Sequence, residues 1–332
     1  MTVTNIAEGE APSEQTGEFT TDLTVTDRHD AADGVVTLTL SAPDGQTLPA
    51  WKPGAHIDLL LDDGLVRQYS LCGDPRDTGH WRIGVLLDPA SRGGSRLVHD
   101  RLHAGSTVRV RGPRNNFPLV DAGEYLFIAG GIGITPILAM ADEAHRSGTE
   151  WSLLYLGRTA ATMAFADDLV DRYGDRVRLW RDDEHGLFDI GAELAEPREN
   201  TLVYCCGPEP LLAAVEEHCG TWPAGSLRIE RFTAKQIEPT EGALENFQVE
   251  CRKSGVTVDV SSDTSILEAL EDADVEIFSS CQEGICGTCE ASVLEGEPDH
   301  RDSMLTDEQR AAGTVILTCV SRSRSAKLVL DL

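Results

Sequence analysis

The stretch CQEGICGTCE, residues 281–290, places three cysteines close together among glycines and acidic residues. A fourth cysteine follows in ILTCVSRSRS, so that the whole spacing is Cys281-x4-Cys286-x2-Cys289-x29-Cys319. The chain has nine cysteines, and its first residues lack the basic and apolar segments of a secretory signal. We therefore expect a reducing, cytoplasmic location, where clustered thiols are more often metal ligands than disulfides.

The spacing of these four cysteines predicts a plant-type two-iron two-sulfur (2Fe–2S) centre with the four thiolates as its ligands. A structural zinc site is the alternative, but such sites usually take two pairs of ligands at short separations. Gly284 and Gly287 lie inside the loop and are small enough to let the chain fold closely around an inorganic core. The pattern favours iron.

The composition indicates a multidomain globular protein and argues against nucleic acid or a membrane as its partner. The chain has 332 residues, of which 41% are hydrophobic and 25% charged, and this indicates a globular protein with more than one domain. A formal net charge of −28 argues against nucleic acid or an anionic membrane as a partner. No run of apolar residues is long enough to span a bilayer. Residues 1–17 are expected to form a disordered tail.

Strand and helix patterns divide the remaining chain into three sections. Short alternating runs such as VVTLTL and TVRVRG at residues 18–120 predict a small antiparallel β-barrel. At 121–232, apolar strands such as WSLLYLG alternate with helical stretches such as ILAMADEAHR, which predicts an α/β domain with a parallel sheet. A linker at 233–244 precedes a third unit, 245–332, with strands at NFQVEC and VTVDV and a helix at TSILEALED.

Two turns of the second section have the form of nucleotide-binding turns. In EYLFIAGGIGITP, a strand ends in glycines that let the backbone approach a diphosphate at a helix N-terminus, which Thr135 would cap. In VYCCGPEPLL, a second strand ends at a similar turn. Either turn alone is weak evidence, since many glycine turns are simply tight turns. Together they predict one nucleotide site formed by Gly130, Gly131, Gly133, Cys206, Gly207 and Pro208.

Six motifs occur in series: RQYSL, SRGGS, GGIGITP, CCGPEPLL, RIERF and the cysteine set. In this order they resemble the phthalate dioxygenase reductase family over nearly everything after the tail. The resemblance implies a multidomain protein with an FMN-binding antiparallel β-barrel, an NAD-binding α/β domain and an α+β ferredoxin domain of the β-grasp type. It also implies an oxidoreductase that passes electrons from NADH through FMN and 2Fe–2S to a separate oxygenase.

The resemblance further implies a set of flavin contacts. Arg67 would bind the flavin phosphate, Tyr69 would lie against the flavin, and Ser70 would lie near its N5 atom. A guanidinium suits a phosphate, and an aromatic ring stacks on isoalloxazine. The phosphate loop would comprise Arg92, Gly93, Gly94 and Ser95. The remaining contacts would be Gln68, Leu86, Leu87, Asp88, Thr135 and Phe232. FAD is the alternative flavin.

On the nicotinamide side, the resemblance places Cys206 near the nicotinamide and Arg158 near the adenosine. The acidic segment RDDEHG, residues 181–186, would repel a 2′-phosphate, so NADH is expected over NADPH. No residue is expected to act as a proton-transfer catalyst, because the cofactors supply the chemistry.

The expected partner is a Rieske-type aromatic dioxygenase or demethylase, with a haem-thiolate monooxygenase as the rival. The docking surface would surround the cysteine loop, with Gln282, Glu283 and Arg322 on its rim. A monomer is expected. A protein of a different class, a ferredoxin-like electron carrier without NADH turnover, is the further alternative.

Overall fold

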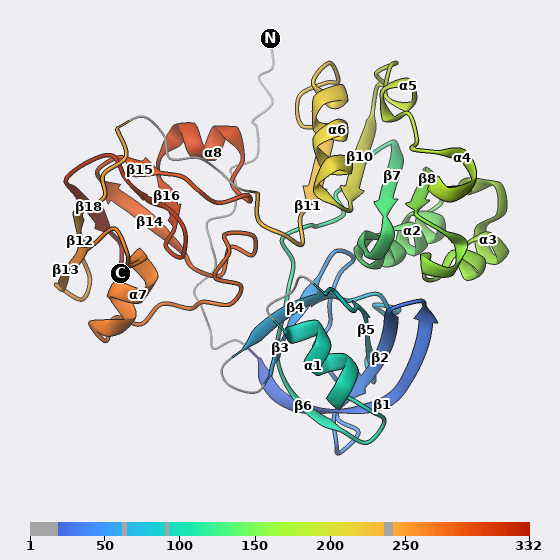
Figure 1. Ribbon diagram of the computed structural model, residues 1–332, viewed down its shortest axis with the longest axis horizontal. Coiled ribbons are helices and arrows are strands. Elements are labelled where there is room, and N and C mark those ends of the chain that lie inside the picture. The colour runs from blue at the N-terminus through green and yellow to red at the C-terminus, as the bar shows by residue number, and fades with distance from the viewer. Residues whose placement is uncertain (1–18, 62–64, 90–92, 236–241) are drawn as a thin grey trace, which may run out of the picture.

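The computed structural model describes residues 19–61, 65–89, 93–235 and 242–332. Three units, each with its own sheet, meet near the centre of the molecule (Figure 1). The first unit lies at the bottom of that view, the second at the upper right and the third at the upper left. The tail expected at 1–17 and half of the expected linker, residues 236–241, lie outside the described residues, and the exact limits of the units stay predictions.

The first unit is an antiparallel barrel. Its strands are β1 (Thr20–Ala32), β2 (Val35–Ser41), β3 (His56–Leu60), β4 (Val66–Ser70), β5 (Trp81–Leu86) and β6 (Thr107–Arg114). They pair in the order β4-β3-β6-β1-β2-β5. A bridge between Leu71 and Ile83, with a 2.8 Å bond from Cys72 N to Arg82 O, joins the two edges. Alternating apolar residues therefore face a closed core, as the sequence predicts. Helix α1 (Gly94–Arg101) lies against β5.

The second unit is a parallel sheet. Its strands are β7 (Glu124–Gly130), β8 (Glu150–Gly157), β9 (Val177–Arg181), β10 (Thr201–Cys206) and β11 (Leu227–Glu230), in the order β11-β10-β7-β8-β9. Helices α2 (Ile134–Ser147) and α3 (Ala166–Tyr173) cover one face, and α5 (Ile190–Glu193) and α6 (Glu209–Cys219) cover the other. A short helix, α4 (Asp182–His185), follows β9. The strand order reverses between β7 and β10, where open α/β sheets bind ligands.

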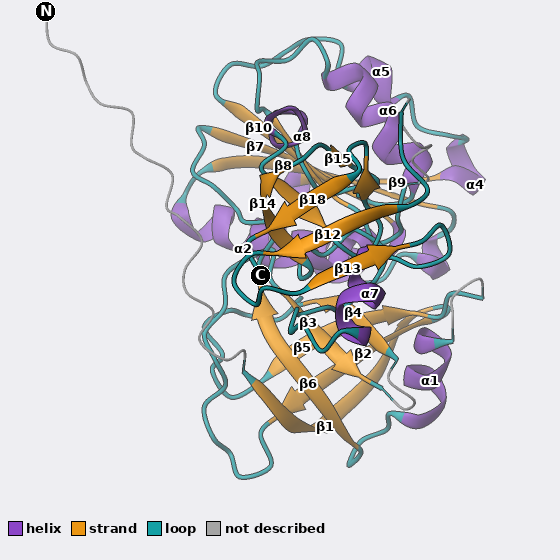
Figure 2. Ribbon diagram, turned by 90° about the vertical axis from the view of Figure 1, so that its left-hand side faces the viewer, coloured by secondary structure: helices purple, strands orange, loops and turns teal. Residues whose placement is uncertain are grey.

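The third unit has a mixed sheet, seen in front in Figure 2. Strands β12 (Phe247–Cys251), β13 (Thr257–Val260), β14 (Glu290–Glu295), β16 (Val315–Leu317) and β18 (Lys327–Leu330) pair in the order β13-β12-β18-β14-β16. Only β12 and β18 are parallel neighbours in it. Helix α7 (Ile266–Asp272) begins with a capping box of Ser265 and Glu268 and packs on the sheet. Helix α8 (Asp307–Ala312) and a small pair, β15 (Pro298–Asp299) and β17 (Arg322–Ser323), complete the unit.

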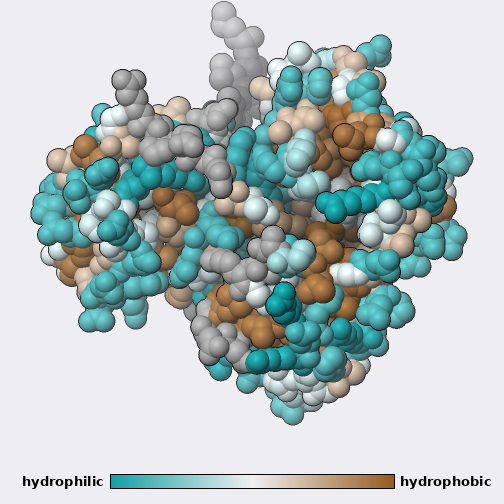
Figure 3. Space-filling model, viewed as in Figure 1, coloured by the Kyte–Doolittle hydropathy of each residue, from teal (hydrophilic) through white to brown (hydrophobic). Residues whose placement is uncertain are grey.

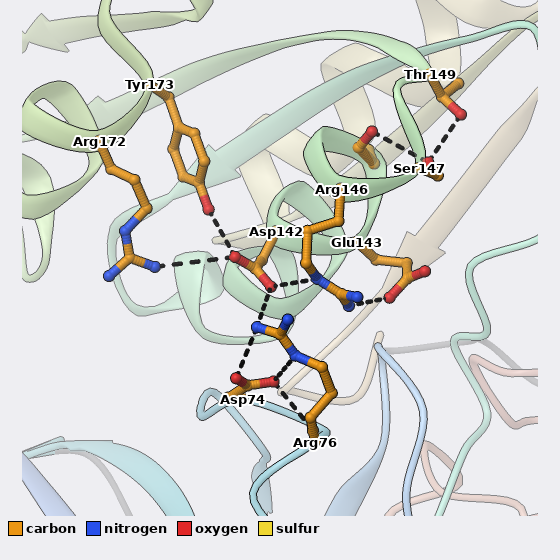
Figure 4. Close-up of polar contacts among 10 residues, drawn as sticks. Asp74, Arg76, Asp142, Glu143, Arg146, Ser147, Thr149, Arg172 and Tyr173 are labelled. Atoms are coloured by element: carbon orange, nitrogen blue, oxygen red, sulfur yellow. Dashed lines mark hydrogen bonds and ion pairs between the residues drawn. The ribbon is translucent and has the colours of Figure 1, made fainter.

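An ionic cluster joins the first two units (Figure 4). Asp142 of α2 lies 3.8 Å from Arg76 of the barrel, 3.0 Å from Arg146 and 4.0 Å from Arg172. The hydroxyl of Tyr173 donates to the same carboxylate at 3.2 Å. Because one carboxylate serves both units, the cluster helps to hold the parallel sheet on the barrel.

Apolar surface gathers where the second unit meets the barrel (Figure 3). Leu86 and Leu87, at the end of β5, are 39% and 40% exposed. Among the described residues, no helix is long and apolar enough to cross a membrane.

Candidate functional site

All three units line one cavity. Strand β4 contributes residues 66–70, the end of β11 contributes 229–232, and the cysteine loop contributes Cys281, Glu283 and Ile285. The structure thus brings together segments that the sequence analysis singled out separately: the RQYS strand, the RIERF segment and the first cluster cysteine. Their roles as cofactor contacts stay predictions.

One corner of this region has the form of a phosphate cradle. A Cβ atom added to Gly94 would lie 2.4 Å from Arg67 Cγ and 2.8 Å from its Nε, so only glycine leaves room for the guanidinium there. Gly93, with a φ of 96°, precedes the first turn of α1. A guanidinium beside a helix N-terminus is the donor set that suits a phosphate. The residues present therefore fit a flavin phosphate. Arg92 lies outside the described residues.

The other flavin-side residues divide into two groups. Tyr69 and Phe232 line the cavity, and Phe232 is 39% exposed, so part of its ring surface is accessible. Leu86, Leu87 and Asp88 do not line it. They continue from β5. Asp88 N donates to Ser95 Oγ at 3.1 Å, so this segment lies beside the first turn of α1.

The two glycine turns that are predicted to bind the nucleotide touch each other. A Cβ atom at Gly133 would lie 2.2 Å from Cys206 O, and one at Gly130 would lie 2.7 Å from Pro208 Cδ and 3.4 Å from Gly207 Cα. Side chains would separate the turns, and glycine lets them close at the point where the strand order reverses. By contrast, Gly131 has a φ of 53° and open space around its Cβ position. This geometry fits a diphosphate passing over both turns.

Thr135 does not cap α2, and that expectation is wrong. A 3-10 turn at Gly131–Gly133 precedes the helix, and the residue at the cap position is Gly133. Thr135 is buried within the first turn, where its hydroxyl donates to Ile132 O at 3.0 Å. Its methyl group would lie 2.9 Å from a Cβ at Gly84 of β5, so Thr135 packs against the barrel.

Arg158 lies exposed at the end of β8, as expected for a residue near the carboxyl edge of the sheet. Its carbonyl accepts a 3.0 Å bond from Asp183 N, so the acidic segment after β9 lies beside it. Cys206, in contrast, is fully buried, and burial raises the pKa of its thiol well above the usual value. Cys206 is therefore a neutral thiol.

Glu230 is a residue of interest that the sequence analysis missed. It lines the cavity at the end of β11, hydrogen-bonds to Ser70 of the barrel, and burial raises its pKa to about 8. Its Oε2 is buried and has no hydrogen-bond partner among the described residues. The available signal was the glutamate inside RIERF, two residues before Phe232. A carboxyl that keeps its proton near neutral pH can donate a hydrogen bond into the cavity.

The four cluster cysteines meet as their spacing predicts. All are buried, and the thiols of Cys286 and Cys319 hydrogen-bond to Cys281 and lower its pKa. Cys319 also hydrogen-bonds to Cys289. Among the described residues, no three or more His, Cys, Asp or Glu side chains are arranged so that they could hold a single metal ion. A 2Fe–2S centre divides its four cysteines between two irons and does not require such an arrangement.

The chain folds tightly around these thiols. Gly284 and Gly287 both have a φ of 72°, and a Cβ at either would lie 2.6 Å from a side chain of the same unit. Glu283 N donates to Cys281 Sγ at 3.3 Å, and Cys286 Sγ lies 3.2 Å from Thr288 Oγ1. Backbone donors around sulfur are what an iron–sulfur cluster requires, so this loop fits one.

The three residues expected on the rim of the cysteine loop lie in different surroundings, and the docking surface itself stays a prediction. Gln282 is exposed, with a φ of 55°, whereas Glu283 faces the cavity between the units. Arg322 is 8% exposed, and its guanidinium donates to the carbonyls of Glu245, Ser261 and Thr264 at 2.6, 2.7 and 3.1 Å. Arg322 is therefore an internal brace of the third unit and cannot lie on a docking surface.

Comparison with known proteins agrees with this site. Residues 249–324 match the 2Fe-2S iron-sulfur cluster binding domain family. The chain is 42% identical over 303 residues to the phenoxybenzoate dioxygenase subunit beta of Ectopseudomonas oleovorans, covering 91% of this chain and 94% of that protein.

Two solved structures cover nearly the whole chain. Phthalate dioxygenase reductase, described as a modular structure for electron transfer from pyridine nucleotides to [2Fe-2S], is 36% identical with a TM-score of 0.70, covering 94% of this chain and 98% of that one. An intact type IV self-sufficient cytochrome P450 monooxygenase is 42% identical with a TM-score of 0.87. This chain is covered to 97% but spans only 43% of that longer protein.

Proposed function

The chain belongs to the phthalate dioxygenase reductase family of oxygenase reductases, and from this premise we propose that it takes electrons from NADH and delivers them through FMN and a 2Fe–2S cluster to a separate oxygenase. The observation that carries the proposal is the shared cavity. Arg67 and Tyr69, the end of β11, and Cys281 line it together, so that a flavin held there would lie between the end of the parallel sheet and the cysteine loop.

The cofactors supply the redox chemistry, because a flavin accepts two electrons from a nicotinamide and releases them singly to iron–sulfur centres. The chain supplies placement. Arg67 and the N-terminus of α1 would hold the flavin phosphate, and the paired glycine turns would receive the diphosphate of the nucleotide. Glu230 and Ser70 present a hydrogen-bonded pair at the point where the barrel meets β11, and Glu230 can hold a proton there.

Preference for NADH over NADPH is supported by the charge at the expected adenosine side. Helix α4 supplies Asp182, Asp183 and Glu184 beside Arg158, while Arg181 pairs with Glu184 at 3.0 Å. Acidic side chains repel the extra phosphate of NADPH.

We propose a Rieske-type oxygenase as the partner and a monomeric reductase. Two relatives of similar length are named for dioxygenases, phenoxybenzoate dioxygenase and phthalate dioxygenase. A haem-thiolate oxygenase is the second candidate, since a cytochrome P450 monooxygenase contains a similar segment within its own longer chain.

A direct test is anaerobic mixing of the purified protein with NADH. The flavin absorption should bleach first, and the reduced protein should then reduce cytochrome c. Adding either a Rieske oxygenase or a haem-thiolate oxygenase then identifies the acceptor by NADH-dependent product formation. A protein that binds iron but no flavin, and does not oxidise NADH, would instead be an electron carrier.

A further inference from the structure

Asp58 of β3 is a fully buried carboxylate that binds two arginines of β6. Arg111 Nη2 lies 2.7 Å from Asp58 Oδ2, and Arg114 pairs with Oδ1. The Asp58 side chain is 0% exposed, and the side chains of Arg111 and Arg114 are 16% and 17% exposed. A carboxylate at this depth requires charged partners, so the three side chains hold one another in place.

A β-bulge makes this convergence possible. His56 faces Arg114 across the β3–β6 ladder, but Asp58 faces Arg111, so β6 uses one residue more than β3 over this interval. Residues three apart on a regular strand point to opposite faces. The extra residue, with Gly112 at a φ of 119°, brings both arginines to the same carboxylate.

Arg111 also reaches the third unit. The same Nη2 that binds Asp58 donates to Ser279 O at 2.7 Å, two residues before Cys281. Two further barrel side chains contact this segment: Gln68 Nε2 donates to Ser280 Oγ at 3.3 Å, and Asn116 Nδ2 donates to Cys286 O. The barrel therefore holds the cysteine loop on both sides of Cys281, the ligand that lines the cavity.

We propose that Arg111, fixed by Asp58, is a positioning residue that holds the cysteine loop against the flavin cavity and thereby sets the rate at which electrons pass from flavin to cluster. We call the pair the Asp58–Arg111 clamp. The inference rests on the proposed function. In the balanced reaction, NADH becomes NAD⁺ and H⁺ and releases two electrons, which pass singly through the loop and reduce two molecules of ferricytochrome c.

Arg111→Gln tests the clamp without exposing the buried charge, because Arg114 still pairs with Asp58. Losing a charge-assisted hydrogen bond should weaken docking of the loop by about tenfold or more. NADH–cytochrome c reduction should therefore fall about tenfold, while NADH–ferricyanide reduction, which the flavin supports directly, should not change. Arg111→Lys should give an intermediate rate, since a single ammonium lacks the planar fork.

Arg109→Gln is the matched control. Arg109 lies two residues earlier on β6, carries the same charge and is exposed. This variant should retain both activities.

Hydrogen exchange supplies a readout that needs no electron transfer. In the intact protein, amides in residues 276–290 should exchange about tenfold faster in Arg111→Gln than in the wild type or in Arg109→Gln. Wild-type exchange in Arg111→Gln, or an equal fall in both activities, would overturn the clamp. Failure of the wild type to reduce ferricyanide with NADH would instead refute the proposed function, and the exchange comparison would still decide the clamp.

Discussion

Replacing Glu230 by glutamine should remove a pH dependence of stability that the buried carboxyl creates. Glu230 Oε2 is buried without a hydrogen-bond partner among the described residues, and burial raises the pKa of the carboxyl from 4.5 to about 8. Below pH 4.5 both the folded and the unfolded chain hold the proton, so this group does not make the stability depend on pH there. Between pH 4.5 and 8 the unfolded chain releases the proton while the folded chain keeps it.

The free energy of unfolding should therefore fall as pH rises through this interval and level off above it. Each pH unit accounts for about 1.4 kcal/mol, so the whole interval of 3.5 units corresponds to about 5 kcal/mol. In Glu230→Gln this dependence is absent. The melting temperature of the variant relative to wild type should rise by on the order of 10 °C between pH 5 and pH 8.

Tryptophan fluorescence is a suitable probe, because all five tryptophans of the chain lie in the first two sections and none in the third. Glu217→Gln, which neutralises an exposed carboxylate on α6 of the same unit, is the control and should follow the wild-type profile. Parallel melting profiles for wild type and Glu230→Gln from pH 5 to pH 8 would refute the reasoning.

Three further predictions concern the cluster, the flavin and the junction of the first two units. Cys286→Ser should abolish the visible absorption of the cluster and cytochrome c reduction but retain NADH–ferricyanide activity; equal loss of both in a folded variant would contradict this. Arg67→Ala should weaken FMN binding by roughly 10- to 100-fold, since a charge-assisted phosphate contact is lost, and flavin release followed by fluorescence would measure it. Asp142→Asn should lower the free energy of unfolding in urea by about 1 kcal/mol at low salt and less in 1 M salt, because its ion pairs are partly exposed. An identical loss at both salt concentrations would exclude a charge effect.

Local sequence patterns predict most of the fold. The barrel strands alternate, the parallel strands are apolar runs, and the cysteine spacing is a property of one short loop and one distant residue. Helix α3 is difficult to predict from the sequence, because the residue before it is Phe165, which has a φ of 63° and makes no side-chain cap. The usual signal for a helix start is absent there.

Long-range contacts could not be predicted in the same way. The bond between Arg111 and Ser279 joins residues 168 positions apart, and nothing near either residue signals the other. The sequence analysis expected Arg322 on the surface because the segment around it, SRSRS, has the polar composition of an exposed loop. Its burial depends on three carbonyls from residues 58 to 77 positions away. Glu230 gave no sign of its raised pKa, since that shift arises from packing against the barrel.

Strand β4 limits how freely the parts of this chain can be exchanged. In only five residues it contributes Arg67 to the phosphate cradle, Gln68 to the third unit and Ser70 to the second. A recombinant chain that joined this barrel to a foreign ferredoxin or nucleotide domain would keep these side chains but lose the residues that they contact. Successful domain shuffling would therefore require the grafted domain to bring matching groups for Gln68 and Ser70, whatever the length of the connecting peptide.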